Sequence, residues 1–206
     1  MSKQDNFTKF TEDYNIAIYR ELIMINDKIE FRESGIEAAS KEYDLELLES
    51  DEGLKYFYEN IDFWFLKWKA KPEYNIEGSL NILSYEKLLI GDVDFEPEKN
   101  KRMKGFTLLD HFYNEAAVGL YLDQPERGLF YFEFDGDPKP LHLDFDGYLK
   151  MLKYTRAFSY WQLSIVTLAN GNPLTMTDKY KNVMKLFPDF NIEELTGLYE
   201  SLRIDK

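Results

Sequence analysis

The amino-acid sequence predicts an α+β fold: a central, largely antiparallel sheet flanked by N-terminal helices and a long C-terminal helix. Three observations lead to this prediction. Apolar residues recur at three- and four-residue steps in the first 60 residues and again after residue 146, which is the helical period. Between these regions, residues 63–145 hold short segments with strand-like alternation. Parallel strands need crossover connections of about a dozen residues or more, and this stretch leaves little room for them.

The first quarter of the chain predicts helices. One apolar stripe repeats with helical spacing, and Asp5 can cap its helix; the members of the stripe are Phe7, Phe10, Tyr14, Ile18, Leu22, Ile25 and Ile29. The "ESG" at residues 33–35 should end this helix, and further helices are expected from about Ile36 and about Ser50. The last of them carries its own apolar stripe of Leu54, Phe57, Tyr58 and Ile61. We therefore expect residues 1–50 to form a helical extension of the domain.

The period changes at "DFWFLKWKAK", residues 62–71, where large apolar and charged side chains alternate as in a strand. The turn sequence "PEYN" follows, and then "IEGSLNIL", residues 76–83, reads as a second strand, so the two predict a hairpin. A short helix capped by Ser84 is expected next. Residues 91–106 are polar, with a proline and two glycines, and predict a loop.

The second half of the chain predicts more strands and then helices. Residues 115–123 and 128–134 read as strands, and Phe130, Phe132 and Phe134 fall on one face of the latter. A short strand at 141–145 should lead into one long helix from about Asp146 to Ala169. Two short helical pieces complete residues 170–206. We expect a single domain of 206 residues with its core in residues 50–169.

The amino-acid composition limits the classes of partner and of cellular location that we expect. The formal net charge is −13 and the sequence pI about 4.7, a field that repels phosphate backbones and attracts basic partners. The chain has no cysteine, which excludes disulfides and thiolate chemistry and suits a reducing compartment. No apolar run approaches the ~18 residues that span a bilayer, and the start of the chain lacks the apolar core of a signal peptide. We therefore expect a soluble cytoplasmic protein that binds neither nucleic acid nor membrane.

One motif raises the question of catalysis. In "PLHLDFDGYLKML", residues 140–152, an alternating run delivers Asp144 and Asp146 just before a helix, as in phosphatases of the haloacid dehalogenase type. That mechanism needs further carboxylates for Mg²⁺ and a cation for the phosphoryl group, and no downstream acidic pair follows an apolar strand. An Asp before a helix also serves as its N-cap, a stabilisation of about 1 kcal/mol. We expect a cap here, with a Mg-dependent phosphatase as a remote alternative.

A metal site is not expected either. His142 and Asp144 have the i, i+2 spacing of a ligand pair, but His111 is the only other histidine in the chain, so the site lacks ligands. No Ser-His-Asp grouping, phosphate-binding loop or dinucleotide fingerprint occurs in the sequence. The sequence therefore predicts no cofactor, no metal and no enzymatic activity.

Four segments, in their order and spacing, resemble the SUKH superfamily, the homologues of a yeast cell-wall-assembly regulator. The segments are "EGSLNILSYEKLL" (77–89), "AVGLYLD" (117–123), "LFYFEFDGDPKPLHLDFDGYLKML" (129–152) and "RAFSYWQ" (156–162). The resemblance covers roughly residues 50–165. Ala157 stands where the family usually has glycine, a departure of little consequence if the position lies on a helix. The resemblance implies an α+β fold without catalytic residues.

In bacteria, members of the superfamily commonly act as immunity proteins that bind and neutralise a cognate polymorphic toxin, often a nuclease. A nuclease active site is basic, and an acidic protein can occupy it as a phosphate mimic. The expected partner is therefore a basic protein toxin, and the alternative is a protein-interaction module of the cell-wall-assembly-regulator type. The candidate contact residues are Tyr131, as an aromatic anchor, and the acids Glu133, Asp135, Asp137, Asp144 and Asp146. For each acid, a turn or cap role remains the competing interpretation.

Overall fold

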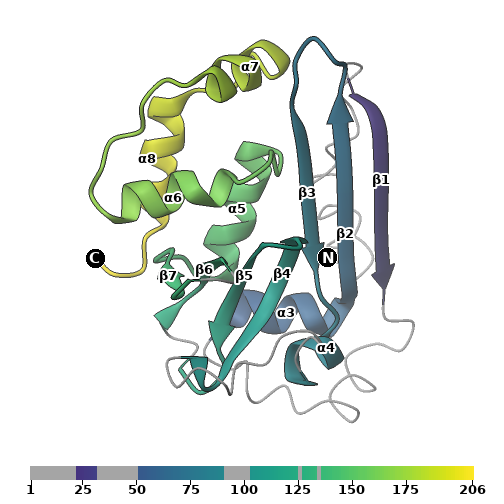
Figure 1. Cartoon of the computed structure of the whole chain (residues 1–206). Coiled ribbons are helices and arrows are strands. Elements are labelled where there is room, and N and C mark those ends of the chain that lie inside the picture. Colours follow the sequence, from purple (N-terminus) through teal and green to yellow (C-terminus); the bar gives the residue numbers. More distant parts are fainter. Residues whose placement is uncertain (1–21, 32–50, 91–102, 125–126, 134–135) are drawn as a thin grey trace, which may run out of the picture.

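A computed structural model describes residues 22–31, 51–90, 103–124, 127–133 and 136–206 (Figure 1). It confirms the α+β class. The strands are β1 (Leu22–Phe31), β2 (Ile61–Ala70), β3 (Glu77–Ile82), β4 (Phe106–Tyr113), β5 (Ala116–Tyr121), β6 (Phe130–Glu133) and β7 (Lys139–Pro140). The helices are α3 (Glu52–Asn60), α4 (Tyr85–Ile90), α5 (Phe145–Thr155), α6 (Trp161–Ala169), α7 (Asp178–Leu186) and α8 (Ile192–Leu202). Among these helices none is long and apolar enough to cross a bilayer.

The strands form one antiparallel sheet in which β1 to β7 are neighbours in chain order. The predicted hairpin is confirmed: β2 pairs with β3, with Trp64 opposite Ile82 and Trp68 opposite Gly78. Trp64 and Trp68 are buried and the intervening Lys67 is exposed, as alternation predicts. In Figure 1, β1 to β3 extend beyond the shorter β4 to β7, and β3 is the one of the three that lies nearest to α5 and α7.

The prediction of the first N-terminal helix is wrong over residues 22–31, whereas the helix predicted from about Ser50 is confirmed as α3. Residues 22–31 form β1, which pairs antiparallel with β2, Ile25 lying opposite Trp68 and Ile29 opposite Trp64. The edge of β2 offers a row of unpaired backbone groups, and satisfying them outweighs a helical spacing of apolar residues. The rest of the predicted first helix, the helix expected from Ile36 and residues 91–102 of the predicted loop lie outside the described residues.

Strand β4 has no counterpart in the prediction. Its sequence, "FTLLDHFY", is buried on both sides along most of its length, so it lacks the alternation that marks a half-exposed strand. One side contributes to the main core and the other to a smaller cluster of Leu83, Met103, Phe106, Leu108, Ala117, Tyr121, Phe130 and Phe132. The sheet is therefore covered on two faces around β4 to β6.

The last predicted strand is shorter and earlier than expected, because β7 contains only Lys139 and Pro140. The backbone of Leu129 still bonds Leu141 and Leu143, each at 2.8 Å. Between them, His142 adopts a left-handed conformation with φ of 53°, which breaks the ladder. The chain leaves the sheet at this point and turns into α5.

The predicted long helix over 146–169 is two helices, α5 and α6, joined by residues 156–160, which we call the α5–α6 joint. Its backbone bonds to the first half of β3: the Ser79 N–H donates to the Ala157 carbonyl at 3.0 Å, and the Ser159 N–H donates to Glu77 at 2.8 Å. The joint thus takes the place of a strand beside the first half of β3. Strand β4 pairs with β3 only at the other end of β3, where Ile82 lies opposite Asp110. Hydrogen bonds to the sheet replace those of a continuous helix.

This break changes the meaning of Ala157. The expectation that it lies on a helix is wrong, because its φ is 54° and it is fully buried in the joint. Arg156 and Tyr160 also have positive φ values, of 53° and 57°. An L-residue in this conformation costs about 1–2 kcal/mol, so a glycine would fit better here.

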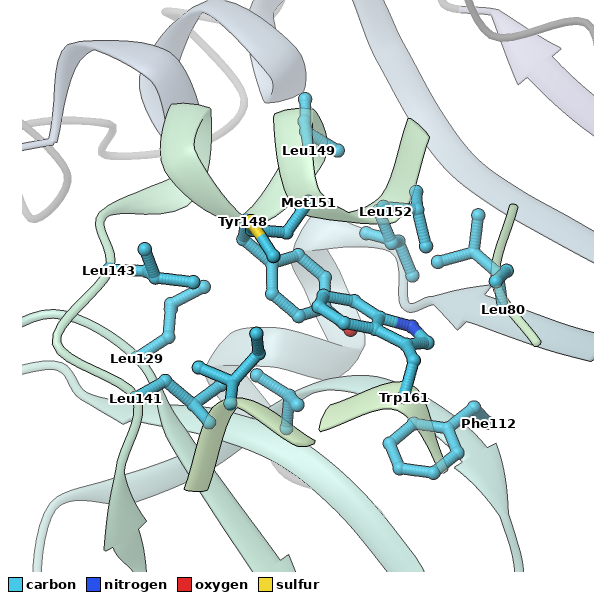
Figure 2. Close-up of a cluster of buried hydrophobic side chains, with 14 of the residues drawn as sticks. Leu80, Phe112, Leu129, Leu141, Leu143, Tyr148, Leu149, Met151, Leu152 and Trp161 are labelled. Atoms are coloured by element: carbon cyan, nitrogen blue, oxygen red, sulfur yellow. The ribbon is translucent and has the colours of Figure 1, made fainter. Parts of the chain in front are cut away.

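The core lies between the sheet and α5 and α6 (Figure 2). Tyr148 and Trp161 pack with their ring centroids 5.1 Å apart, which ties the two helices together across the joint. Met151 and Leu152 of α5 point into the same space. Side chains of the sheet and of the segments around β6 and β7 complete the cluster, among them Leu80, Phe112, Leu129, Leu141 and Leu143.

Candidate functional site

The acidic motif that suggested a phosphatase is a meeting point of two helix N-termini. Asp144 is the N-cap of α5, and its Oδ1 accepts a hydrogen bond from the Gly147 N–H at 2.7 Å, so the predicted cap is confirmed for Asp144. Asp51 caps α3 through the Leu54 N–H at 2.9 Å. The other oxygen of Asp51 accepts from the Phe145 N–H, also at 2.9 Å. One buried carboxylate therefore serves the first turns of two helices.

The surface around these caps is acidic. Asp146 lies against the backbone of Gly53, where an added Cβ would collide with its carboxylate. Glu52 and Asp146 are exposed, and Asp144 is half-buried. We call Asp51, Glu52, Asp144 and Asp146 the acidic junction. Burial raises the pKa of Asp51 and nearby Asp144 and Asp146 raise it further, while its two backbone hydrogen bonds lower it.

The other predicted contact residues lie on and beside β6. Tyr131 is 1% exposed, so the expectation of a surface aromatic anchor is wrong. Its hydroxyl donates to Glu133 at 3.2 Å, and the Lys139 ammonium binds the other oxygen of Glu133 at 2.8 Å. The hydrogen bond from Lys139 lowers the pKa of Glu133. Asp137 is exposed in the turn before β7.

The six predicted residues thus fall into separate groups. The structure brings Asp144 and Asp146 together at the start of α5, and it joins Tyr131 to Glu133 through a hydrogen bond. Asp135 lies outside the described residues. Among the described residues, Glu133 forms an ion pair with Lys139, whereas the acidic junction gathers four carboxyl groups at the first turns of α3 and α5.

Sequence reasoning missed a pocket of about 470 Å³. It lies where the turn between β2 and β3 meets the α5–α6 joint and α7, and we call it the Lys179 pocket. The lining residues are Lys69, Ala70, Pro72, Asn75, Ile76, Glu77, Ser159, Tyr160 and Lys179. They come from three parts of the chain, 69–77, 159–160 and 179. Glu77, Ser159 and Tyr160 lie in segments that carry the family resemblance, but no motif indicates a binding site, so only the fold assembles the pocket.

The wall of this pocket is stiffened by polar contacts of the joint. The Ser159 hydroxyl lies 2.6 Å from that of Tyr113 and 2.9 Å from the Glu77 carbonyl. The rings of Tyr113 and Tyr160 stack with centroids 4.9 Å apart. A hydrogen bond from Tyr160 to Glu115, with burial, raises the pKa of Tyr160 to about 12, so the Tyr160 hydroxyl keeps its proton at neutral pH. These contacts fix one side of the cavity.

A network of polar side chains also runs through the core. Asp110 is fully buried and accepts hydrogen bonds from the Tyr148 hydroxyl at 2.6 Å and from the Asn81 N–H at 2.7 Å. Gln162 donates to the Tyr148 hydroxyl at 3.2 Å. Burial raises the pKa of Asp110 to about 6, against the lowering effect of its two donors. This hydrogen-bond network connects β3, β4, α5 and α6, and its role is structural.

Over the described ranges, no cluster of three or more His, Asp or Glu side chains is arranged to hold a metal ion. Comparison with protein-family models, curated proteins and solved structures found no significant match. The acidic junction and the Lys179 pocket are therefore characterised by their own chemistry alone.

Proposed function

We propose that the protein is a non-enzymatic binding protein that neutralises a basic protein toxin, in the manner of the SUKH immunity proteins that its sequence resembles. The observation that carries the proposal is the acidic junction. Glu52 and Asp146 are exposed beside Asp144, on a chain with a net charge of −13. Such a surface attracts a cationic partner and speeds its association.

The helix caps fix the carboxylates of Asp51 and Asp144 within this acidic surface. The bond from the Gly147 N–H holds the Asp144 side chain in one orientation, and Asp51 locks α3 and α5 to each other beneath it. Carboxylates that are ordered before binding lose less conformational entropy when a partner arrives. A fixed group of carboxylates is also what imitation of nucleic-acid phosphates requires.

Co-expression with toxins encoded beside the gene tests the proposal. We expect one of these toxins to be neutralised in cells and to bind the purified protein directly, with an affinity that falls as salt rises. Protection from none of them would contradict the toxin assignment. Binding to an endogenous protein without protection would favour the interaction-module alternative.

Charge reversal then tests the surface. Asp146→Lys should weaken toxin binding by about tenfold, mainly through slower association. Glu73→Lys is the matched control, because it changes the net charge equally on an exposed residue in the turn between β2 and β3, away from α3. Equal losses in both variants would point to bulk charge, and no loss in Asp146→Lys would remove the acidic junction from the interface.

A further inference from the structure

Lys179 is a cation in an unusual place. Its ammonium lies 4.8 Å from the ring centroid of Phe158 and 5.9 Å from that of Tyr160, on the wall of the Lys179 pocket. Within the part of the chain that the structure describes, it has no carboxylate partner. Burial lowers its pKa to about 8, so most molecules still carry the charge at pH 7. Aromatic faces stabilise such a charge only in part.

The rest of the pocket suggests the kind of group that would complete this site. Lys69 adds a second cation, and Ala70, Pro72 and Ile76 supply an apolar wall. The volume of about 470 Å³ lies in the range of small-molecule sites, roughly 300–1,000 Å³. Glu77 also lines the pocket and, with the acidic charge of the whole chain, disfavours a dianion.

We propose that the Lys179 pocket binds a small organic monocarboxylate, with the Lys179 ammonium as the counter-ion and the hydrocarbon part against Ala70, Pro72 and Ile76. A carboxylate restores the pairing that a partly buried ammonium lacks, and a charge-assisted hydrogen bond of this kind is stronger than a neutral one. The site is separate from the acidic junction and does not depend on the proposed function.

Benzoate is a suitable probe, with benzamide as its neutral counterpart and phenyl phosphate as a dianionic one. In amide NMR titrations of the full chain at low salt, benzoate should cause saturable shifts at Asn75, Ile76 and Ser159. Benzamide and phenyl phosphate should each bind at least about tenfold more weakly. This comparison uses the unaltered protein, so it does not depend on the folding of any variant.

Variants of α7 locate the effect. Lys179→Met keeps the apolar stem of the side chain and should weaken benzoate binding at least about tenfold, whereas Lys179→Arg should keep most of it. Lys181→Met is the matched control, because Lys181 is exposed on the same helix and pairs with Asp178. Absence of saturable shifts, equal binding of benzamide, tighter binding of phenyl phosphate or equal losses in the two Met variants would each overturn the assignment.

Discussion

The two ends of helix α5 are built on different principles. At the N-terminus, Asp144 has an ordinary extended backbone with φ of −75° and caps a residue only three positions away. At the C-terminus, Arg156 and Ala157 adopt left-handed conformations without being glycine. A local hydrogen bond accounts for the N-terminal end. At the C-terminal end, the backbone conformation of Arg156 and Ala157 is itself unfavourable. Contacts from elsewhere in the chain must therefore hold it.

Those contacts come from several directions. The Trp68 indole N–H donates to the Arg156 carbonyl at 2.8 Å, and the backbones of Gly78 and Phe158 bridge as in a sheet. The Arg156 guanidinium forms an ion pair with Asp189 and lies 5.0 Å from the ring centroid of Phe187. The difference between the two ends shows that a helix can end where its sequence favours further helix, because a sheet edge offers better hydrogen bonds.

The C-terminal end can be broken from the sheet side, at Gly78. A Cβ there would overlap the Ala157 carbonyl and the Trp68 indole. Gly78→Ala should therefore lower the free energy of unfolding by about 3 kcal/mol, measured by urea denaturation. Gly197→Ala is the control, because it lies within α8 with open space around it and should stabilise by about 0.5–1 kcal/mol. A neutral Gly78→Ala would mean that the joint does not hold the helix end.

The middle of α5 offers a pH test through Tyr148 and Asp110. The Asp110 pKa is raised in the folded state from 3.8 to about 6, so the folded protein binds the extra proton between these values. The raised pKa of Asp110 therefore adds to the free energy of unfolding below pH 4. This contribution, about 3 kcal/mol in all, is lost as the pH rises through 6. Asp110→Asn cannot titrate, so wild-type stability relative to this variant should fall by most of that amount between pH 4 and pH 7. A constant difference in denaturation midpoints would contradict a buried ionisation here.

The N-terminal end of α5 can be tested at Asp51. This residue caps α3 but also accepts a hydrogen bond from Phe145, the first residue of α5. Asp51→Ala would leave the N–H groups of Leu54 and Phe145 without their acceptor in a buried place, at a cost of about 2 kcal/mol. Asp144→Ala removes one cap from a half-buried position and should cost about 1 kcal/mol. Thermal and urea unfolding of the two variants measure both values. Equal losses would mean that the second bond of Asp51 contributes nothing.

The smallest change in the free energy of unfolding is expected for a substitution of Ala157 itself. Ala157→Gly relieves the left-handed strain, worth about 1 kcal/mol, but loses a buried methyl group worth about 0.8 kcal/mol. We expect its unfolding free energy to stay within about 0.5 kcal/mol of the wild type. Ala117→Gly, in the interior of β5, loses a methyl group without any relief and should cost about 1.5 kcal/mol. Similar losses in both variants would show that Ala157 is not strained.

The predictions from sequence succeeded where neighbours along the chain decide the structure. The β2–β3 hairpin follows from the alternation around Trp64 and Trp68, and α3 from its apolar stripe. They failed at β1, where helical spacing yields to pairing with β2, and at β4, which is buried on both sides. At β1 the decisive partner is a strand that the segment meets only after folding, and at β4 the burial of both faces depends on the tertiary structure.

The candidate sites divide in the same way. A cap at Asp144 or Asp146 was predicted because a cap needs only its own helix, and the structure gives this role to Asp144. Tyr131 was expected at the surface, but the sheet buries its ring, because a strand pattern does not say which face will be covered. The Lys179 pocket gave no signal, since its wall is assembled from three distant parts of the chain.

By itself, the sequence determined the α+β class, the acidic charge, the β2–β3 hairpin and the cap at the start of α5. These depend on composition, on periodicity and on hydrogen bonds between residues a few positions apart. Only the tertiary structure decided that residues 22–31 are a strand, that α5 ends at Thr155 and that Lys179 lines a cavity. The reason is that a backbone group or a charge satisfies itself with the best partner within reach, and folding brings distant partners within reach.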